Sequence, residues 1–276
     1  MSLPADSPLI DVEALVALVA QGGATVLDVR YHVGGPPGAT EHARGHVPGA
    51  SYVDLDTALA GTPGARGRHP LPDPGDFEEA MRAAGVRQDH SVVVYDDWAG
   101  RAAARCWWLL RWAGHRDVRV LDGGWSAWVA AGQPVSDRPA DPVRGDLVVR
   151  PGGMPVLARA DVLGHAEREV LIDARNPERF RGDVEPLDPV AGHIPGALNV
   201  ATGDNLTDQG RFRPVEELRQ VYAAAAGHEV AAYCGSGVTA THDILAMSLV
   251  GIDAALYAGS WSEWVADSSR PVATGD

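Results

Sequence analysis

Four short blocks of this sequence occur twice, in the same order. Each block in the first half has a counterpart of similar sequence in the second half. The pairs are 26–30 with 171–175, 45–50 with 192–197, 92–95 with 230–233, and 121–128 with 257–264. Repeats in a fixed order indicate a duplicated domain. The chain of 276 residues is therefore expected to fold as two similar units, in agreement with the two domains that this length suggests.

Both halves alternate short apolar segments with amphipathic ones. We predict strands near 25–29, 91–95 and 118–121 in the first half, and near 170–173, 230–233 and 254–257 in the second. We predict helices near 12–20, 76–84, 101–113 and 125–131, and near 159–166, 215–225, 238–249 and 261–266. This alternation predicts an α/β fold in which each domain is a mostly parallel sheet flanked by helices.

The stretch between the two halves is rich in proline and glycine, which is typical of an extended linker. We place the first domain at 1–138, the linker at 139–155 and the second domain at 156–276. Ligands of such sheets bind at the carboxyl ends of the strands, so functional residues are expected there.

Cys234 lies at such an end, between the predicted strand 230–233 and the predicted helix 238–249. The loop after it contains Gly235 and Gly237, so it can curl and direct its backbone N–H groups at the sulfur. The helix N-terminus adds partial positive charge. Both effects favour the thiolate, and at such places the pKa of a cysteine falls from about 8.5 to roughly 3.5–7.5. Cys234 is therefore predicted to be a nucleophile, with the hydroxyls of Ser236 and Thr239 close to its sulfur.

The other cysteine, Cys106, precedes Trp107 on an apolar helix and is expected to be core packing. Two cysteines are too few for a disulfide framework and suit a reducing cytosol, so we expect a cytoplasmic protein. We also expect no secretory signal in residues 1–10 and no membrane span, because no apolar run approaches the length of about 18 residues that a span needs. The net charge of −14 argues against nucleic acid or an anionic membrane as a partner.

The two copies differ at the position of the nucleophile. The alignment of the strands places Asp96 opposite Cys234, so the first copy cannot supply a thiolate there. The first copy also has extra residues around 54–73, which we read as an extended, proline-rich and glycine-rich loop. Loops on a rigid scaffold tend to carry function. The first copy is thus expected to be a non-catalytic partner that contributes a functional loop.

The repeated blocks resemble the tandem-domain rhodaneses over nearly the whole chain. The loop Cys234-Gly235-Ser236-Gly237-Val238-Thr239-Ala240 is similar to that of the 3-mercaptopyruvate sulfurtransferase branch. The thiosulfate branch typically has arginine and lysine in place of Gly235 and Ser236. The resemblance implies a sulfurtransferase that moves sulfane sulfur from a small anionic donor, 3-mercaptopyruvate, through a Cys234 persulfide. The acceptor would be cyanide, a dithiol or a reduced thioredoxin, and no cofactor or metal is implied.

The resemblance also implies roles for individual residues. Ser236 matches a serine that handles protons together with a histidine and an aspartate of the first domain, which His69 and Asp56 match by position. Arg179, in Arg179-Phe180-Arg181-Gly182, aligns with an arginine that binds the donor carboxylate. The loop residues expected to bind substrate and persulfide are Gly235, Gly237, Val238 and Thr239.

One residue departs from the pattern of the family. A second arginine that lies downstream in the family is Leu187 in this chain. This difference bears on the affinity for 3-mercaptopyruvate and on the identity of the donor. Arg181 is either a substitute cation or an ordinary surface arginine.

Residues that both copies share, including the copy without the cysteine, are expected to serve the fold. They are His46 and His193, the local ion pairs Asp28–Arg30 and Asp173–Arg175, and the core tryptophan pairs Trp125/Trp128 and Trp261/Trp264.

Three other functions compete with mercaptopyruvate sulfur transfer. A cysteine phosphatase needs an arginine at the sixth position after the cysteine, and that residue is Ala240, so the phosphate-binding side chain is missing. A thiosulfate:cyanide sulfurtransferase (rhodanese) with an unusual loop stays open. A non-enzymatic sulfur-relay or binding module also stays open, and release of sulfur to cyanide compared with protein thiols would separate it from an enzyme.

Overall fold

The computed structural model describes residues 7–276 and divides into two compact units. The first unit contains residues up to 61, 72–154 and 209–211, and the second contains 62–71, 155–208 and 212–276. The segment 62–71 precedes most of the first unit in sequence but clusters with the second unit. The boundaries drawn above at 138 and 156 stay a prediction of how the sequence divides.

The first unit is built on a five-stranded sheet in which every paired strand is parallel. The strand order is β1-β5-β4-β2-β3. The strands are β1 (Leu9–Ile10), β2 (Ala24–Asp28), β3 (Ser51–Tyr52), β4 (Ser91–Tyr95) and β5 (Val118–Leu121). The central strands are buried on both faces and consist of near-continuous apolar runs, as parallel strands between helices do.

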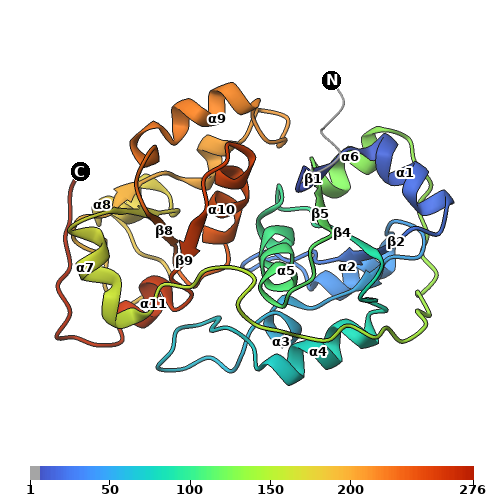
Figure 1. Ribbon diagram of the computed structural model, residues 1–276, viewed down its shortest axis with the longest axis horizontal. Coiled ribbons are helices and arrows are strands. Elements are labelled where there is room, and N and C mark those ends of the chain that lie inside the picture. The colour runs from blue at the N-terminus through green and yellow to red at the C-terminus, as the bar shows by residue number, and fades with distance from the viewer. Residues whose placement is uncertain (1–6) are drawn as a thin grey trace. The chain divides into compact units, whose positions relative to one another are not determined.

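Helices cover both faces of this sheet. They are α1 (Val12–Ala20), α2 (Gly38–Arg44), α3 (Leu55–Ala58), α4 (Pro74–Ala83), α5 (Arg101–Trp112) and α6 (Gly124–Ala130). Side chains of α1 and α6 pack with Val26, Val93 and Tyr95 in one core cluster. The almost wholly buried helix α5 packs against β4 and β5 outside that cluster. Figure 1 shows α5 beside β4 and β5, with α1 and α6 on the other side of the strands.

The second unit repeats this arrangement around a four-stranded parallel sheet with the order β7-β6-β8-β9. Its strands are β6 (Val170–Asp173), β7 (Leu198–Asn199), β8 (Val230–Tyr233) and β9 (Ala254–Leu256). Its helices are α7 (Val162–Ala166), α8 (Pro177–Arg181), α9 (Val215–Val221), α10 (Ala240–Leu249) and α11 (Ser260–Trp264), with 3₁₀ turns η1 (Arg159–Asp161), η2 (Thr202–Asn205) and η3 (Ala223–Ala225). α10 packs against β8 and β9, whereas α7 and α11 join a core cluster on the other face (Figure 1).

Both units contain the same buried ion pair at the end of a central strand. Arg30 donates to Asp28 and to the carbonyl of Gly45, and in the second unit the guanidinium of Arg175 donates to Asp173 and to the carbonyl of Gly192. The guanidinium of Arg175 stacks 4.6 Å from the ring centre of Trp261. These pairs connect the strand end to the Gly-His block and to the last helix of each unit. The prediction that they are local ion pairs is confirmed.

The repeated histidines serve the fold, as predicted. Nδ1 of His46 lies 2.8 Å from the carbonyl oxygen of His42, and Nδ1 of His193 lies 2.8 Å from that of Phe180. A carbonyl can only accept, so each Nδ1 donates. The predicted core positions of Trp128, Trp261 and Trp264 are confirmed as well, while Trp125 is half-buried under the guanidinium of Arg30.

The sequence reading missed the shortest elements. The two-residue strands β1, β3 and β7 have no periodicity to detect, and α2 and α8 lie in segments for which the sequence predicts no helix. The segment 54–73 is not extended throughout, because it contains α3. α3 begins where the side chain of Asp54 accepts a hydrogen bond from the N–H of Thr57, which is a normal helix cap.

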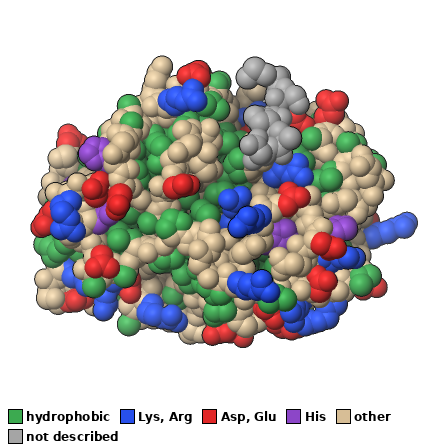
Figure 2. Space-filling model, viewed as in Figure 1, with side chains coloured by type: hydrophobic (Ala, Val, Ile, Leu, Met, Phe, Trp, Pro, Cys, Tyr) green, Lys and Arg blue, Asp and Glu red, His purple; other side chains and the backbone are tan. Residues whose placement is uncertain are grey.

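Positive and negative side chains alternate on the face drawn in Figure 2 rather than forming one basic patch. All 23 positive side chains are arginines, since the sequence contains no lysine.

None of the helices within residues 7–276 combines the length and the apolar character that a bilayer crossing requires.

We predict that the Asp173→Asn variant unfolds more easily than wild type by about 3 kcal/mol, because removing one partner leaves the other charge of a buried pair uncompensated. The side chains of Asp173 and Arg175 are 0% and 1% exposed. The control is Asp183→Asn, which removes an ion pair with Arg181 whose carboxylate is 58% exposed and should cost less than about 1 kcal/mol. Urea denaturation followed by circular dichroism measures both. Equal midpoints for the two variants would contradict the assignment.

Candidate active site

Cys234 directly follows β8, and its thiol is free and 1% exposed. Its Sγ accepts a hydrogen bond of 3.2 Å from the N–H of Gly237. The loop can make this turn because Gly237 has φ of +78°, and a Cβ there would lie 2.3 Å from the carbonyl oxygen of Ala258. Only glycine fits such a position. The sulfur therefore lies inside a tight loop that directs at least one backbone donor at it.

The first turn of α11 holds the backbone of this loop in place. The N–H of Cys234 donates to Oγ of Ser260 (3.1 Å), and the carbonyl of Cys234 accepts from the N–H of Trp261 (2.9 Å). The carbonyl of Gly235 accepts from the N–H of Ser262 (2.9 Å). Three bonds thus fix two successive residues of the loop.

Ser260 makes its bond at a conformational cost. It has φ of +54°, in the left-handed region that side-chain-bearing residues rarely adopt. Its Oγ also donates to the carbonyl of Tyr257 (3.0 Å), and the residue is fully buried. Backbone strain of this kind costs about 1–3 kcal/mol and occurs most often at functional sites. Sequence reasoning missed Ser260, although the serine opposite Gly124 in the repeat was a visible signal.

Ser236 and His69 are in hydrogen-bond contact. Oγ of Ser236 lies 2.7 Å from Nδ1 of His69, which comes from the segment 62–71 of the second unit. The same segment is anchored on α11, because the N–H of Arg68 donates to Oγ of Ser262 (3.1 Å). The structure thus brings together two of the residues proposed to handle protons. Asp56 belongs to the first unit, where it lies exposed in the first turn of α3, and its role stays a prediction.

Arg179 lies on α8 and is held by a buried carboxylate. Its Nε and Nη2 donate to Glu185 at 3.0 and 2.6 Å, and Glu185 is 3% exposed. Burial opposes ionisation of Glu185, but the bonds from Arg179 and from the N–H groups of Leu187 and Asp188 hold its pKa below the usual value. Residue 187 is a leucine with an exposed side chain. This position therefore supplies no second cation.

Arg68 is a second guanidinium at the loop, and sequence reasoning missed it. Its Nη1 donates to the buried carboxylate of Asp188. A Cβ built on Gly235 would lie 2.9 Å from Nη2 of Arg68 and 3.4 Å from Nη2 of Arg179. Gly235 thus leaves space that both arginines occupy. The position of Arg68 directly before His69 in the sequence was the available signal.

The remaining loop residues lead directly into α10. Val238 is buried, and Thr239 precedes the first residue of the helix, Ala240. The N-terminus of α10 therefore begins within six residues of Cys234, as the sequence predicted. Cys106 is fully buried on α5, and burial raises the pKa of its thiol, so the prediction of core packing is confirmed.

The corresponding loop of the first unit is occupied by its own side chain. The carboxylate of Asp96, which is fully buried, accepts hydrogen bonds of 2.8–2.9 Å from the N–H groups of Trp98, Gly100, Ala102 and Ala103. The carbonyl of Asp96 accepts from the N–H of Trp125 at 2.8 Å, as that of Cys234 does from Trp261. The two loops are therefore equivalent, and the first has an internal anion in place of the nucleophile.

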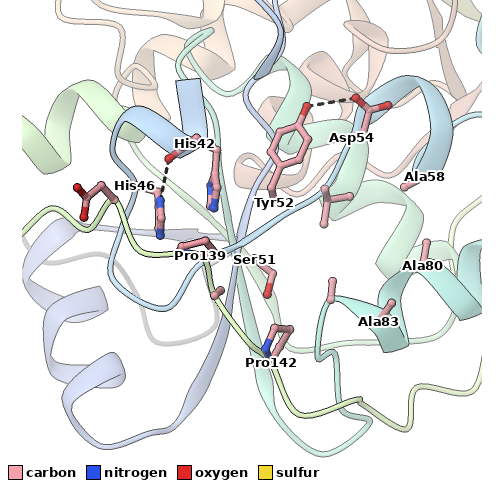
Figure 3. Close-up of a pocket in the computed structure, with 15 residues that line it drawn as sticks. His42, His46, Ser51, Tyr52, Asp54, Ala58, Ala80, Ala83, Pro139 and Pro142 are labelled. Atoms are coloured by element: carbon pink, nitrogen blue, oxygen red, sulfur yellow. Dashed lines mark hydrogen bonds between the residues drawn. The ribbon is translucent and has the colours of Figure 1, made fainter. Parts of the chain in front are cut away.

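The first unit also contains a cavity of about 490 Å³, drawn in Figure 3. Its wall includes Ala58, Ala80 and Ala83, whose short side chains leave the space open. Two of its polar side chains bond to neighbours within the unit: Nδ1 of His46 donates to the carbonyl of His42, and the hydroxyl of Tyr52 donates to Asp54. The described residues that line it include no cysteine. The nucleophile of the chain is therefore to be sought at the Cys234 loop.

Comparisons with known proteins show the family of the chain. The family model of the rhodanese-like domain matches residues 11–131 and 159–267. The chain is 46% identical to a probable 3-mercaptopyruvate sulfurtransferase of Pseudomonas aeruginosa, over 97% of this chain and 98% of that one. It is 42% identical to the putative thiosulfate sulfurtransferase SseB of Mycobacterium tuberculosis, over 97% of each chain. The crystal structure of SseA from Escherichia coli, a 3-mercaptopyruvate sulfotransferase, superimposes with a TM-score of 0.83 at 30% identity, covering 93% of this chain and 99% of that one.

We predict that Ser260→Ala lowers the specificity constant for sulfur transfer about tenfold, because the buried N–H of Cys234 loses its acceptor and the loop loses one of its three anchors; tenfold corresponds to about 1.4 kcal/mol. Ser248→Ala is the control, since the hydroxyl of Ser248 donates to the carbonyl of Leu245 within α10. Steady-state rates of both folded variants test this. A Ser260→Ala enzyme with wild-type rates would show that the backbone bonds alone fix the loop.

Proposed function

Because the chain belongs to the tandem rhodanese-domain sulfurtransferases, we propose that it transfers sulfane sulfur from 3-mercaptopyruvate to a thiophilic acceptor through a persulfide on Cys234. The observation that carries this proposal is the pairing of Ser236 with His69 beside the Cys234 loop. A serine–histidine pair can move the proton that this donor requires. Loop N–H groups such as that of Gly237 stabilise the sulfur anion, in the manner of an oxyanion hole.

The first step forms one bond and breaks one. The thiolate of Cys234 attacks the thiol sulfur of the donor, and the bond between that sulfur and carbon 3 breaks. The electron pair of that bond leaves on the pyruvate fragment as an enolate, which takes up the proton of the donor thiol and becomes pyruvate. Ser236 and His69 would pass this proton, and their contact of 2.7 Å is within the distance that general acid–base catalysis needs. The product on the enzyme is a Cys234 persulfide anion.

The second step returns the enzyme to its starting state. A thiophilic acceptor attacks the outer sulfur of the persulfide, and Cys234 leaves as the thiolate that the loop stabilises. Cyanide would give thiocyanate, and a dithiol or a reduced thioredoxin would give a persulfide and then a disulfide with release of sulfide. Asp56 completes the proposed proton-handling set, and Gly235, Val238 and Thr239 contribute their amides to the binding of the transferred sulfur.

The charges around the loop favour a donor with one negative charge. Arg68 and Arg179 are each bound by a buried carboxylate, Asp188 and Glu185, so the four groups together are neutral. A monoanionic keto acid needs directional donors rather than a large positive potential. Thiosulfate is a dianion and would need net positive charge in the same space, where charges interact more strongly than in bulk water. This argues for 3-mercaptopyruvate over thiosulfate as the preferred donor.

The donor preference is tested by measuring kcat/KM for 3-mercaptopyruvate and for thiosulfate with cyanide as the acceptor. We expect the value for 3-mercaptopyruvate to exceed that for thiosulfate by at least about tenfold, a difference of 1.4 kcal/mol. The thiosulfate:cyanide alternative predicts the reverse order. A persulfide that forms on Cys234 but is released only to a protein thiol, and never to cyanide, would favour the relay module instead.

We predict that Cys234→Ser abolishes sulfur transfer with either donor, because serine cannot form a persulfide. Cys106→Ser should retain most of the activity, since Cys106 packs in the core of the first unit. Mass spectrometry of the protein after incubation with donor should find the added sulfur on Cys234 alone. Equal loss of activity in two folded variants would rule out a single nucleophile.

A further inference from the structure

Two guanidinium groups from different segments lie close to Gly235 in the Cys234 loop. Nη2 of Arg68 lies 2.9 Å, and Nη2 and Nη1 of Arg179 lie 3.4 and 3.6 Å, from the position that a Cβ of Gly235 would occupy. Arg68 comes from the segment 62–71 and Arg179 from α8. Gly235 is bonded directly to Cys234 in sequence. Both cations therefore lie at the residue next to the one that carries the sulfur.

Two guanidinium groups so close to each other need counter-ions. Two buried carboxylates, Asp188 and Glu185, supply them. The carboxylate of Asp188 is 4% exposed, accepts from Nη1 of Arg68, and lies 3.6 Å from Nη2 of Arg179. Glu185 binds the Nε and Nη2 edge of Arg179. The N–H of Arg68 is fixed on Ser262. Both arginines are thus oriented by buried partners, with 31% and 17% of their side chains exposed to receive a ligand.

Asp188 also shows what chemistry fits between the two arginines. One carboxylate oxygen faces Arg68 and the other faces Arg179, so a single carboxylate already bridges the pair from the inner side. A donor carboxylate can bridge the same two groups from the outer side. Guanidinium groups suit this role because their N–H donors lie in one plane and match the two oxygens of a carboxylate.

We propose that Arg68 is a second donor-binding arginine, which grips the carboxylate of the keto-acid donor together with Arg179. This rests on the proposed function, since it assigns part of the same site. The second positive charge then comes from the residue before His69, while the exposed Leu187 contributes none. One segment of ten residues thereby supplies both a cation for the substrate and the partner of Ser236.

The experiment uses two alkylating agents that differ by one carboxylate. Bromopyruvate and bromoacetone are both α-bromo ketones, and with either one Sγ of Cys234 bonds to the CH₂ carbon while the C–Br bond breaks and bromide leaves. Only bromopyruvate has the carboxylate. The ratio of the two rate constants at Cys234 therefore reports carboxylate binding, and changes in thiolate fraction or loop shape cancel. The rates are measured by mass spectrometry of the Cys234 peptide in the full-length protein.

We expect Arg68→Gln to lower the bromopyruvate/bromoacetone ratio about tenfold, and Arg179→Gln to lower it at least as much, since each removes a charge-assisted bond to the carboxylate. Arg68→Lys should recover part of the ratio, because it restores the charge without the planar fork. Arg66→Gln is the matched control on the same segment: Arg66 is exposed and lines a separate cavity of about 190 Å³, and the ratio should not change.

The same variants are then assayed for sulfur transfer, where Arg68→Gln should raise KM for 3-mercaptopyruvate more than it lowers kcat. An unchanged alkylation ratio in Arg68→Gln, with a reduced ratio in Arg179→Gln, would overturn the proposal and leave Arg179 alone as the carboxylate ligand. Failure of wild type to use 3-mercaptopyruvate would overturn the proposed donor instead. The alkylation ratio would still report whether Arg68 binds a carboxylate.

Discussion

The three hydrogen bonds between the first turn of α11 and the Cys234 loop are the interaction on which the site depends. They fix the N–H and carbonyl of Cys234 and the carbonyl of Gly235, so the curl of the loop and the direction of its donors follow. One of them exists in both units, because Trp125 bonds the carbonyl of Asp96 as Trp261 bonds that of Cys234. The bond through Ser260 belongs to the second unit alone, since Gly124 occupies that position in the first and has no side chain.

The difference between Asp96 and Cys234 gives two loops of the same shape different chemistry. A loop of this shape directs several N–H groups at one point, and such a point stabilises an anion. In the first unit the carboxylate of Asp96 is that anion and accepts four N–H groups. A substrate anion cannot displace a carboxylate that is covalently part of the chain. In the second unit the sulfur of Cys234 occupies the equivalent position. In each proposed cycle its thiolate takes up a second sulfur and is then regenerated.

Much of the fold followed from the sequence, because the repeat and the apolar runs are strong patterns. The strands around Val93 and Ala231 and the buried helix α5 were predicted within a residue or two of their ends. The two-residue strands could not be predicted, since they form only when a longer strand offers a free edge. α8 escaped for a similar reason, as five residues leave no periodicity to read.

The site was predicted in part for a related reason. Cys234, Ser236 and Arg179 lie in motifs, so their positions could be read from the chain. Arg68 and Asp188 lie in irregular segments 120 residues apart in sequence, and only the folded chain pairs them. The strain at Ser260 was also out of reach, because a positive φ at a serine is imposed by its surroundings rather than by its own preference.

The segment 62–71 has no helix or strand, yet contacts with α11 fix the positions of its side chains. Gly67 has φ of +98°, and a Cβ there would lie 2.7 Å from the carbonyl oxygen of Gly259, so the segment approaches α11 as closely as a backbone can. Arg68 follows with its N–H on Ser262, and His69 follows with its ring on Ser236. Successive residues thus seat the segment on α11, bring the guanidinium of Arg68 to Gly235 and bring the ring of His69 to Ser236. In a chain with net charge −14, long-range attraction does not favour an anionic ligand. The guanidinium groups of Arg68 and Arg179 at Gly235 supply the local N–H donors that such a ligand needs.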